Sequence, residues 1–108
     1  MRLSGRGEVR KIISSGRRRP SAIGLVISLP RAKVRGRIAI TISSKIAKKS
    51  SERNKIRRQL SELARLEFAK KPLARDSVVM VSPLISSWTA RILRQKAVQT
   101  FETMNVTS

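Results

Sequence analysis

The feature that most restricts how this chain folds is a long stretch of helical periodicity, residues 51–70, that is apolar on one side only. At about 100° per residue, four apolar side chains share one arc of this helix: Ile56, Leu60, Leu63 and Ala64. We expect Ser50 or Ser51 to cap its start and Pro72 to end it. A helix with one apolar stripe buries that stripe against a second layer of structure.

The second layer is predicted to be a sheet. Apolar residues alternate with small or polar ones in residues 22–29 and 37–43, and residues 77–81 form a short apolar strand. Helices are also predicted at residues 7–15, with Gly16 in the left-handed conformation that ends many helices, and from Ser86 or Ser87 to about Met104. Residues 17–20 and 45–49 are expected to be basic connections. The order helix, strand, strand, helix, strand, helix predicts one α+β domain over residues 1–108, a two-layer sandwich with a central mixed sheet.

Positive charge is the outlying property of the composition. The chain has 25 Lys and Arg against 6 Asp and Glu, which gives a net charge of +19. Such a surplus repels itself in the folded state and attracts polyanions, and the release of counterions drives binding to a nucleic acid. Its densest part is the segment Arg53-Asn54-Lys55-Ile56-Arg57-Arg58. Asn54, Arg57, Arg58 and Arg65 lie on the side of helix 51–70 opposite the apolar stripe, and Arg53 and Lys55 lie on its flanks.

A basic helix face can also be merely solvated, which is the usual explanation of an isolated charge run. Here, however, like charges four residues apart, such as Arg53 and Arg57, repel by roughly 0.2–0.5 kcal/mol per pair. Only Glu62 offers an outward acidic partner. We therefore interpret this face as an RNA-binding surface. For Asn54 two alternatives stay open: a local hydrogen bond to the backbone near the helix start, or a direct contact with RNA.

The composition excludes several kinds of active site. The chain contains no cysteine and no histidine, which removes disulfides, thiolate nucleophiles, histidine bases and Cys/His zinc sites. The six acidic residues form no cluster of the kind that holds two catalytic metal ions. No apolar run approaches the roughly 18 residues of a membrane span, and the N-terminus does not resemble a signal peptide. We expect a soluble, cytoplasmic protein without a catalytic residue, a bound metal ion, a membrane partner or a small-molecule substrate.

In their context, residues Arg53 to Arg58 resemble the RNR motif helix of the bacterial ribonuclease P protein. The resemblance extends over nearly the whole chain: an opening helix before Gly16, a strand ending at Leu29, residues 37–43 before a basic turn, and Asp76 before a short apolar strand. It implies an unusual left-handed βαβ crossover around the motif helix. It also implies a protein that binds the ribonuclease P RNA and the 5′ leader of precursor tRNA, while the RNA subunit removes the leader with magnesium ions.

Two candidate surfaces follow. The predicted RNA-binding residues are Arg53, Asn54, Lys55, Arg57, Arg58, Arg65, Lys45, Lys48, Lys49, Arg17, Arg18 and Arg19. By the resemblance, a leader cleft between the first helix and the sheet would be lined by Val9, Ile13 and Ile27. These are aliphatic where the family usually has aromatic residues. Because stacking on an aromatic ring contributes ~1–3 kcal/mol per base, we expect leader binding to be weaker or less dependent on the bases.

Two further positions depart from the family pattern. Ser61 stands where an arginine is common, and residues 48–52 replace a glycine-containing approach to the motif. The main alternative function is that of a basic structural ribosomal protein, which shares the charge and the size. A cationic membrane-active helix and a DNA-binding architectural protein fit the charge, but strands and proline breaks argue against the first. No groove-reading helix pair supports the second.

Overall fold

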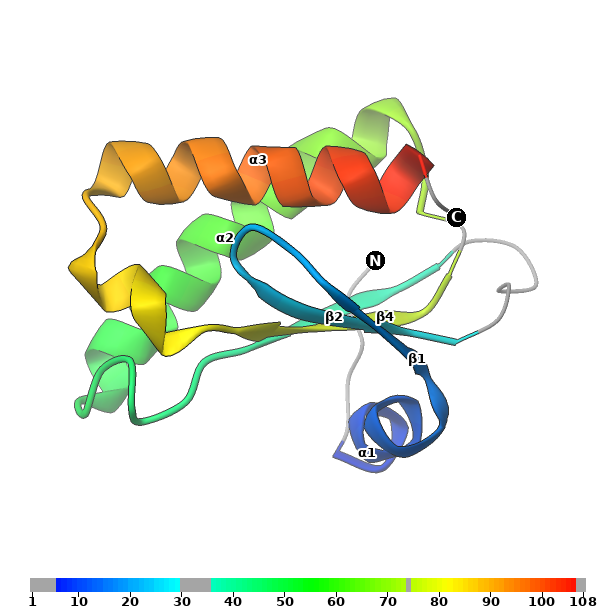
Figure 1. Cartoon of the computed structure of the whole chain (residues 1–108), viewed down its shortest axis with the longest axis horizontal. Helices are drawn as coiled ribbons and strands as arrows, with labels where there is room; N and C mark the ends of the chain where they lie inside the picture. Colours follow the sequence, from blue (N-terminus) through cyan, green and yellow to red (C-terminus); the bar gives the residue numbers. More distant parts are fainter. Residues whose placement is uncertain (1–5, 30–35, 74, 107–108) are drawn as a thin grey trace.

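The computed structural model of the chain describes residues 6–29, 36–73 and 75–106. In these residues the elements are α1 (Arg6–Ser15), β1 (Arg17–Pro20), β2 (Gly24–Ser28), β3 (Ile38–Thr41), α2 (Ser50–Lys70), β4 (Ser77–Val81), the 3-10 helix η1 (Pro83–Ser87) and α3 (Ala90–Val106). Figure 1 shows α2 and α3 on one face of the sheet and α1 on the other. The α+β class and the mixed sheet predicted from the sequence are confirmed.

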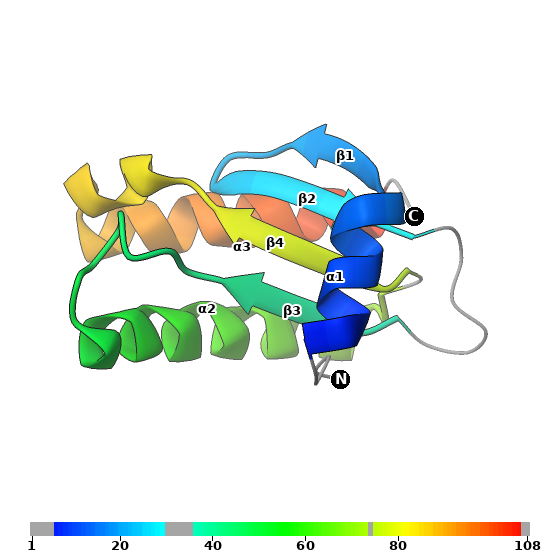
Figure 2. The same ribbon diagram turned by 90° about the horizontal axis from the view of Figure 1, so that it is seen from below.

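The four strands lie in the order β1-β2-β4-β3. Strands β1 and β4 pair antiparallel with β2, whereas β3 pairs parallel with β4. The parallel pair is connected through α2, which lies behind the sheet in Figure 2. Followed from β3 through α2 to β4, the crossover is left-handed, against the strong general preference for the right-handed form. This agrees with the expectation drawn from the resemblance.

The sheet separates two hydrophobic cores. The larger lies between the sheet and the α2–α3 layer, where Leu60 and Ala64 of α2 and Phe101 of α3 are buried. Phe68 packs edge-on against Phe101 with 5.7 Å between ring centroids. The smaller core lies under α1 and has Ile12, Ile27 and Val78 at its centre. The predicted apolar stripe of residues 51–70 is therefore confirmed as a core-facing stripe, with Ile56 and Leu63 at its edges.

Strand β1 was not predicted, because residues 17–20 were expected to be a basic loop. All four of its residues are exposed, so no apolar period reveals it. It is an edge strand, where a proline such as Pro20 is tolerated. The turn to β2 is closed by Ser21, which accepts a hydrogen bond from the Gly24 amide (3.2 Å). Gly24 has a φ of 154°, and a Cβ there would lie 2.2 Å from the Met80 carbonyl oxygen, so only glycine fits.

Three expectations about helix ends are wrong. Among the described residues, only Gly24 is a glycine with positive φ, so Gly16 is not a left-handed cap. Gly16 instead permits close approach, since a Cβ there would lie 2.6 Å from both the Ile12 carbonyl oxygen and a methyl group of Ile27. Helix α2 begins at residue 50 without a side-chain cap, after Lys49. Residues 83–87 form η1, and α3 begins only at residue 90, because residue 88 is extended between the two helices.

Candidate nucleic-acid interface

The basic turn and the first half of α2 form one continuous positive surface. The turn follows β3 and is anchored by Ile46, which is buried in the larger core. Lys45, Lys48 and Lys49 are exposed around it. The first N–H groups of a helix carry partial positive charge, and no side chain caps those of α2. The lysines and the helix terminus therefore produce positive electrostatic potential at the same place, and this favours binding of a polyanion.

Arg53 serves the turn rather than the outer face of α2. Its Nη1 donates to the carbonyl oxygens of Ala47 (2.9 Å) and Lys48 (2.7 Å), and the side chain is partly buried. These bonds hold the turn that presents the lysines. Direct contact between Arg53 and RNA stays a prediction, and in this structure Nη1 of Arg53 is bonded to backbone carbonyls.

The outward face of α2 carries Asn54, Lys55, Arg57 and Arg58. Arg57 donates from Nη1 to the side-chain Oδ1 of Asn54 (2.8 Å), and Arg58 donates from Nε to the Asn54 carbonyl oxygen (3.4 Å). The side-chain oxygen of Asn54 therefore accepts from a neighbouring arginine and not from the helix backbone. Contact between Asn54 and RNA stays a prediction. We call the cations of the turn and of this face the basic ridge: Lys45, Lys48, Lys49, Lys55, Arg57 and Arg58, all of them exposed except Arg57, which is partly buried.

Arg65 differs from the ridge because it has an acidic partner. Its Nε donates to Glu62 Oε2 at 3.0 Å, and its Nη2 donates to Oε1 of the same carboxylate. The hydrogen bond from Arg65 lowers the pKa of the Glu62 carboxyl, and the same bond raises the pKa of Arg65. Contact between Arg65 and RNA stays a prediction. This ion pair agrees with the expectation that Glu62 is the outward acidic partner. It reduces the net positive charge of this turn of α2.

The α1 side of the sheet corresponds to the predicted leader cleft. Val9 and Ile13 are partly buried against the smaller core. Ile27 has 0% exposure beneath α1, so in this structure it offers no surface to a ligand. The next row of the sheet, formed by Leu25 of β2, Met80 of β4 and Thr41 of β3, is only partly covered. Met80 is 38% exposed. Figure 2 shows α1 crossing one end of the sheet and leaving this part open.

Leu25 and Met80 were missed as candidate cleft residues. Strand alternation places Leu25 on the same face as Ile27, and the register places Met80 beside it. The sequence contained that signal. It did not contain the position of α1 along the strands, and that position decides which row is covered.

A salt bridge at the start of β3 connects α1 to the sheet. Arg37 Nη1 lies 3.2 Å from Glu8 Oε2 on α1, and Nη2 lies 3.2 Å from Asp76 Oδ2 before β4. The Arg37 amide also donates to Asp76 Oδ1 at 2.9 Å. The hydrogen bond that the Arg37 guanidinium donates to Asp76 raises the pKa of Arg37 above its usual value. Glu8 and Asp76 therefore help to place α1 against the sheet, and Arg37 is neutralised in doing so.

The structure does not bring the three predicted RNA-binding residues of β1 together on one surface. Arg18 lies opposite Ile27 and donates from Nη2 to the Ile13 carbonyl oxygen (3.5 Å), so it faces the α1 side. Arg17 and Arg19 lie opposite Ser28 and Val26, and Val26 belongs to the larger core. Directly opposed residues of an antiparallel pair share a face. Arg17 and Arg19 therefore point toward α3.

Neither a metal site nor a membrane span is found in the part of the chain that the structure describes. No three His, Cys, Asp or Glu side chains gather there as they would around a metal ion. None of the described helices has the length and the hydropathy needed to cross a membrane.

Comparison with known proteins gives a consistent result. The sequence model of the family Ribonuclease P matches residues 1–105. The RNase P protein from Thermotoga maritima is similar in structure, with a TM-score of 0.78 at 21% identity over 95% of this chain and 96% of that chain. The Staphylococcus aureus RNase P protein gives a TM-score of 0.73 at 15% identity over 99% of this chain and 97% of that chain. No curated protein matches the sequence.

At these identities the two solved structures establish the fold, and the family match establishes descent. The match spans both surfaces described above, the basic ridge and the α1 side of the sheet. The resemblance first noted at Arg53 to Arg58 is therefore supported along almost the entire chain, and the protein belongs to the ribonuclease P protein family.

Proposed function

We propose that the chain is the RNA-binding subunit of a ribonuclease P holoenzyme, with the ribonuclease P RNA and precursor tRNA as its partners. The observation that carries the proposal is the basic ridge, whose six cations lie around the uncapped start of α2 and along its first half. In the described residues, none of the six lies within ion-pair distance of a carboxylate. Self-repulsion at this density is offset when a phosphate backbone lies against it.

The polypeptide's role is to bind and to place RNA rather than to cleave it. It has no histidine or cysteine to act as base or nucleophile. We propose that the ribonuclease P RNA performs the magnesium-dependent cleavage, and that the protein neutralises phosphates where the two RNAs meet. Magnesium sites on the RNA then fill at lower ion concentration. Such an assembly would act in the cytoplasm, on precursor tRNA, without a cofactor held by the protein itself.

The 5′ leader would lie on the open part of the α1 side. There the partly exposed Met80 lies beside Leu25 and Thr41 in the sheet. Leu25 packs against the same smaller core as Val9 and Ile13 of α1. Aliphatic and thioether side chains contact the sugar and base without the stacking that an aromatic ring provides. We therefore expect weak preference for leader sequence.

Reconstitution with a bacterial ribonuclease P RNA tests the proposal. Added protein is expected to lower the magnesium concentration needed for precursor-tRNA cleavage and to tighten precursor-tRNA binding. If it does neither, the proposal is wrong. The alternative of a structural ribosomal protein predicts a different result, namely copurification with ribosomal particles and no stimulation of cleavage.

A further inference from the structure

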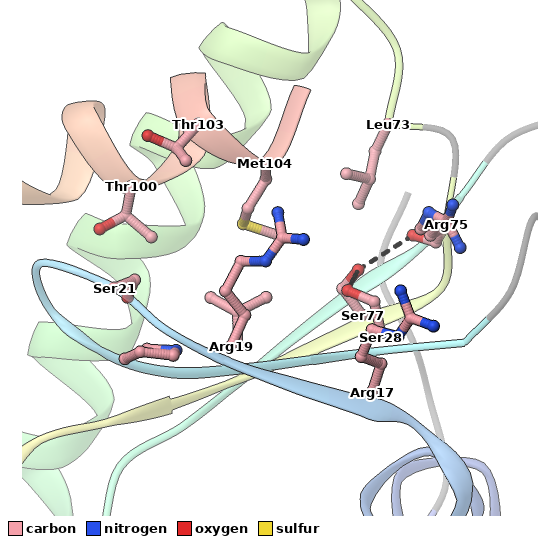
Figure 3. Close-up of a pocket in the computed structure, with 12 residues that line it drawn as sticks. Arg17, Arg19, Ser21, Ser28, Leu73, Arg75, Ser77, Thr100, Thr103 and Met104 are labelled. Atoms are coloured by element: carbon pink, nitrogen blue, oxygen red, sulfur yellow. Dashed lines mark hydrogen bonds between the residues drawn. The ribbon is translucent and has the colours of Figure 1, made fainter. Parts of the chain in front are cut away.

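The most distinctive feature outside the two surfaces described above is a pocket between the β1 edge and the C-terminal part of α3. It encloses about 80 Å³, several times the about 10–15 Å³ that one water molecule requires. Figure 3 shows its lining. Three arginines from two separate segments contribute to it, Arg17 and Arg19 of β1 and Arg75 just before β4, and none of the lining residues is acidic.

The three guanidinium groups have no acidic partner among the residues that the structure describes. In the described ranges of the chain, no carboxylate lies within ion-pair distance of Arg17, Arg19 or Arg75. Arg75 donates one hydrogen bond, from Nη1 to the Leu29 carbonyl oxygen at 3.3 Å. A guanidinium group has five N–H donors in a planar fork, so most of the donor capacity of Arg75 remains for a ligand.

The hydroxyl groups at the base of the pocket are engaged with one another. Ser77, which is 1% exposed, donates from Oγ to the Arg75 carbonyl oxygen (3.2 Å) and lies 2.9 Å from Ser28 Oγ. Because the Ser77 hydroxyl proton is donated to the Arg75 carbonyl oxygen, the Ser28 hydroxyl must donate to Ser77 Oγ. Neither hydroxyl proton is then available to a ligand. The serines therefore fix the backbone that carries Arg75, and the guanidinium groups are the donors that face a ligand.

The remaining lining combines the hydroxyl-bearing residues Ser21, Thr100 and Thr103 with an apolar part. Val26, Leu73 and Met104 are buried core residues that also border the pocket. Beside apolar walls the effective dielectric constant is lower than in water, which strengthens an arginine–anion contact. A pocket with a closed base suits the end of a ligand better than the middle of a continuous strand.

From this arrangement we propose that the pocket binds a terminal phosphate group, either free inorganic phosphate or the phosphate at the end of a nucleotide or RNA strand. A terminal phosphate carries about −1.5 to −2 charge at pH 7 and three acceptor oxygens. A group with this charge and these oxygens suits a pocket lined by three arginines better than an internal phosphodiester, which carries a single charge, does. This site lies at the β1 edge, whereas the basic ridge adjoins β3 at the opposite edge. The proposal is therefore independent of the function proposed above.

The test is a titration of the full chain with inorganic phosphate, followed by NMR at the backbone amides of Ser28, Ser77 and Thr100. Two variants are compared: Arg19→Ala, which removes a pocket arginine, and Arg18→Ala, which removes the same charge from the other face of the same strand. Saturable shifts are expected in the unmodified protein and in R18A, with at least tenfold weaker binding in R19A. Absent shifts, or equal weakening in both variants, would overturn the proposal.

A second titration identifies the form of the phosphate. A 5′-phosphorylated trinucleotide is compared with its 5′-hydroxyl counterpart at the same amides. Stronger binding of the phosphorylated form supports a site for a terminal phosphate, and equal binding of the two contradicts it. Thermal unfolding without phosphate serves as the folding control. R19A is expected to melt no lower than the unmodified protein, because it relieves repulsion among three arginines and breaks none of the hydrogen bonds described above.

Discussion

Replacement of Arg57 and Arg58 with alanine should change the salt dependence of RNA binding by a calculable amount. Each phosphate contact contributes about 0.9 to the slope of log K against log salt for a duplex, so loss of two contacts reduces the slope by about 1.8. Raising salt from about 50 mM to about 200 mM is a fourfold change. The ratio of the RNA affinity of the unmodified protein to that of the double variant should then fall about 12-fold. The measurement is fluorescence anisotropy with labelled ribonuclease P RNA at several salt concentrations.

The matched control is the double replacement of Lys70 and Lys71, exposed at the other end of α2. It removes the same charge, but at 1.5 Å per residue Lys70 lies about 18 Å from Arg58, beyond the screening length of about 8 Å at physiological salt. Its slope should stay that of the unmodified protein. An unchanged slope in the Arg57 and Arg58 variant would mean that the ridge does not face phosphate. Equal reductions in both variants would mean that net charge alone governs binding.

Three further predictions concern how the surfaces are held in place. Gly16→Ala should destabilise the protein by about 1–3 kcal/mol in urea unfolding, because the added Cβ would lie 2.6 Å from atoms of α1 and the sheet. Gly7→Ala, with no atom within 4 Å of the new Cβ, should be neutral or stabilising, and equal effects of the two would contradict the reasoning. Arg53→Ala should speed hydrogen exchange in the basic turn and weaken RNA binding, yet reduce the salt slope by less than one contact, since Arg53 acts through backbone carbonyls. Because Arg65 lowers the pKa of Glu62 in the folded state, their pair contributes stability above the unfolded pKa, and this is lost as pH falls through the folded pKa. In Glu62→Gln this contribution is absent, so the variant should lose less stability on acidification than the unmodified protein does. The measurement is the free energy of unfolding of both proteins at pH 7 and below pH 4.

Where hydrophobic periodicity is strong, the sequence predicted the structure closely. Strand β4 has the predicted bounds, residues 77–81, and α2 differs by one residue at its start. One face of α2 is buried in a core, and β4 is buried on both faces. The spacing of the apolar residues in the sequence reflects that burial. Strand β1 is different because it is exposed on both faces and therefore has no period to detect. Its identity depends on pairing with β2, which is a long-range property of the sheet.

The candidate sites show the same division. Helical periodicity correctly placed Arg57 and Arg58 away from the core, but it placed Arg53 only on the flank of that face. Its actual direction depends on where the turn presents the Ala47 and Lys48 carbonyl oxygens. Gly16 was recognised as an important glycine for the wrong reason. Its requirement comes from the packing of α1 on β2, which local sequence does not encode.

Seven arginines of this protein fall into two groups that the composition cannot distinguish. Arg37, Arg53 and Arg65 bind carboxylates or backbone carbonyls, and each holds an element or a turn in position. Arg17 and Arg19 line the β1-edge pocket, and Arg57 and Arg58 lie on the ridge, in both cases without a carboxylate partner among the described residues. Carboxylates neutralise Arg37 and Arg65, whereas Arg53 keeps its charge but is held against the turn. The total of 25 Lys and Arg therefore overstates the number of cations that are available for phosphate contacts. The measured salt slope should follow the cations without partners rather than the total.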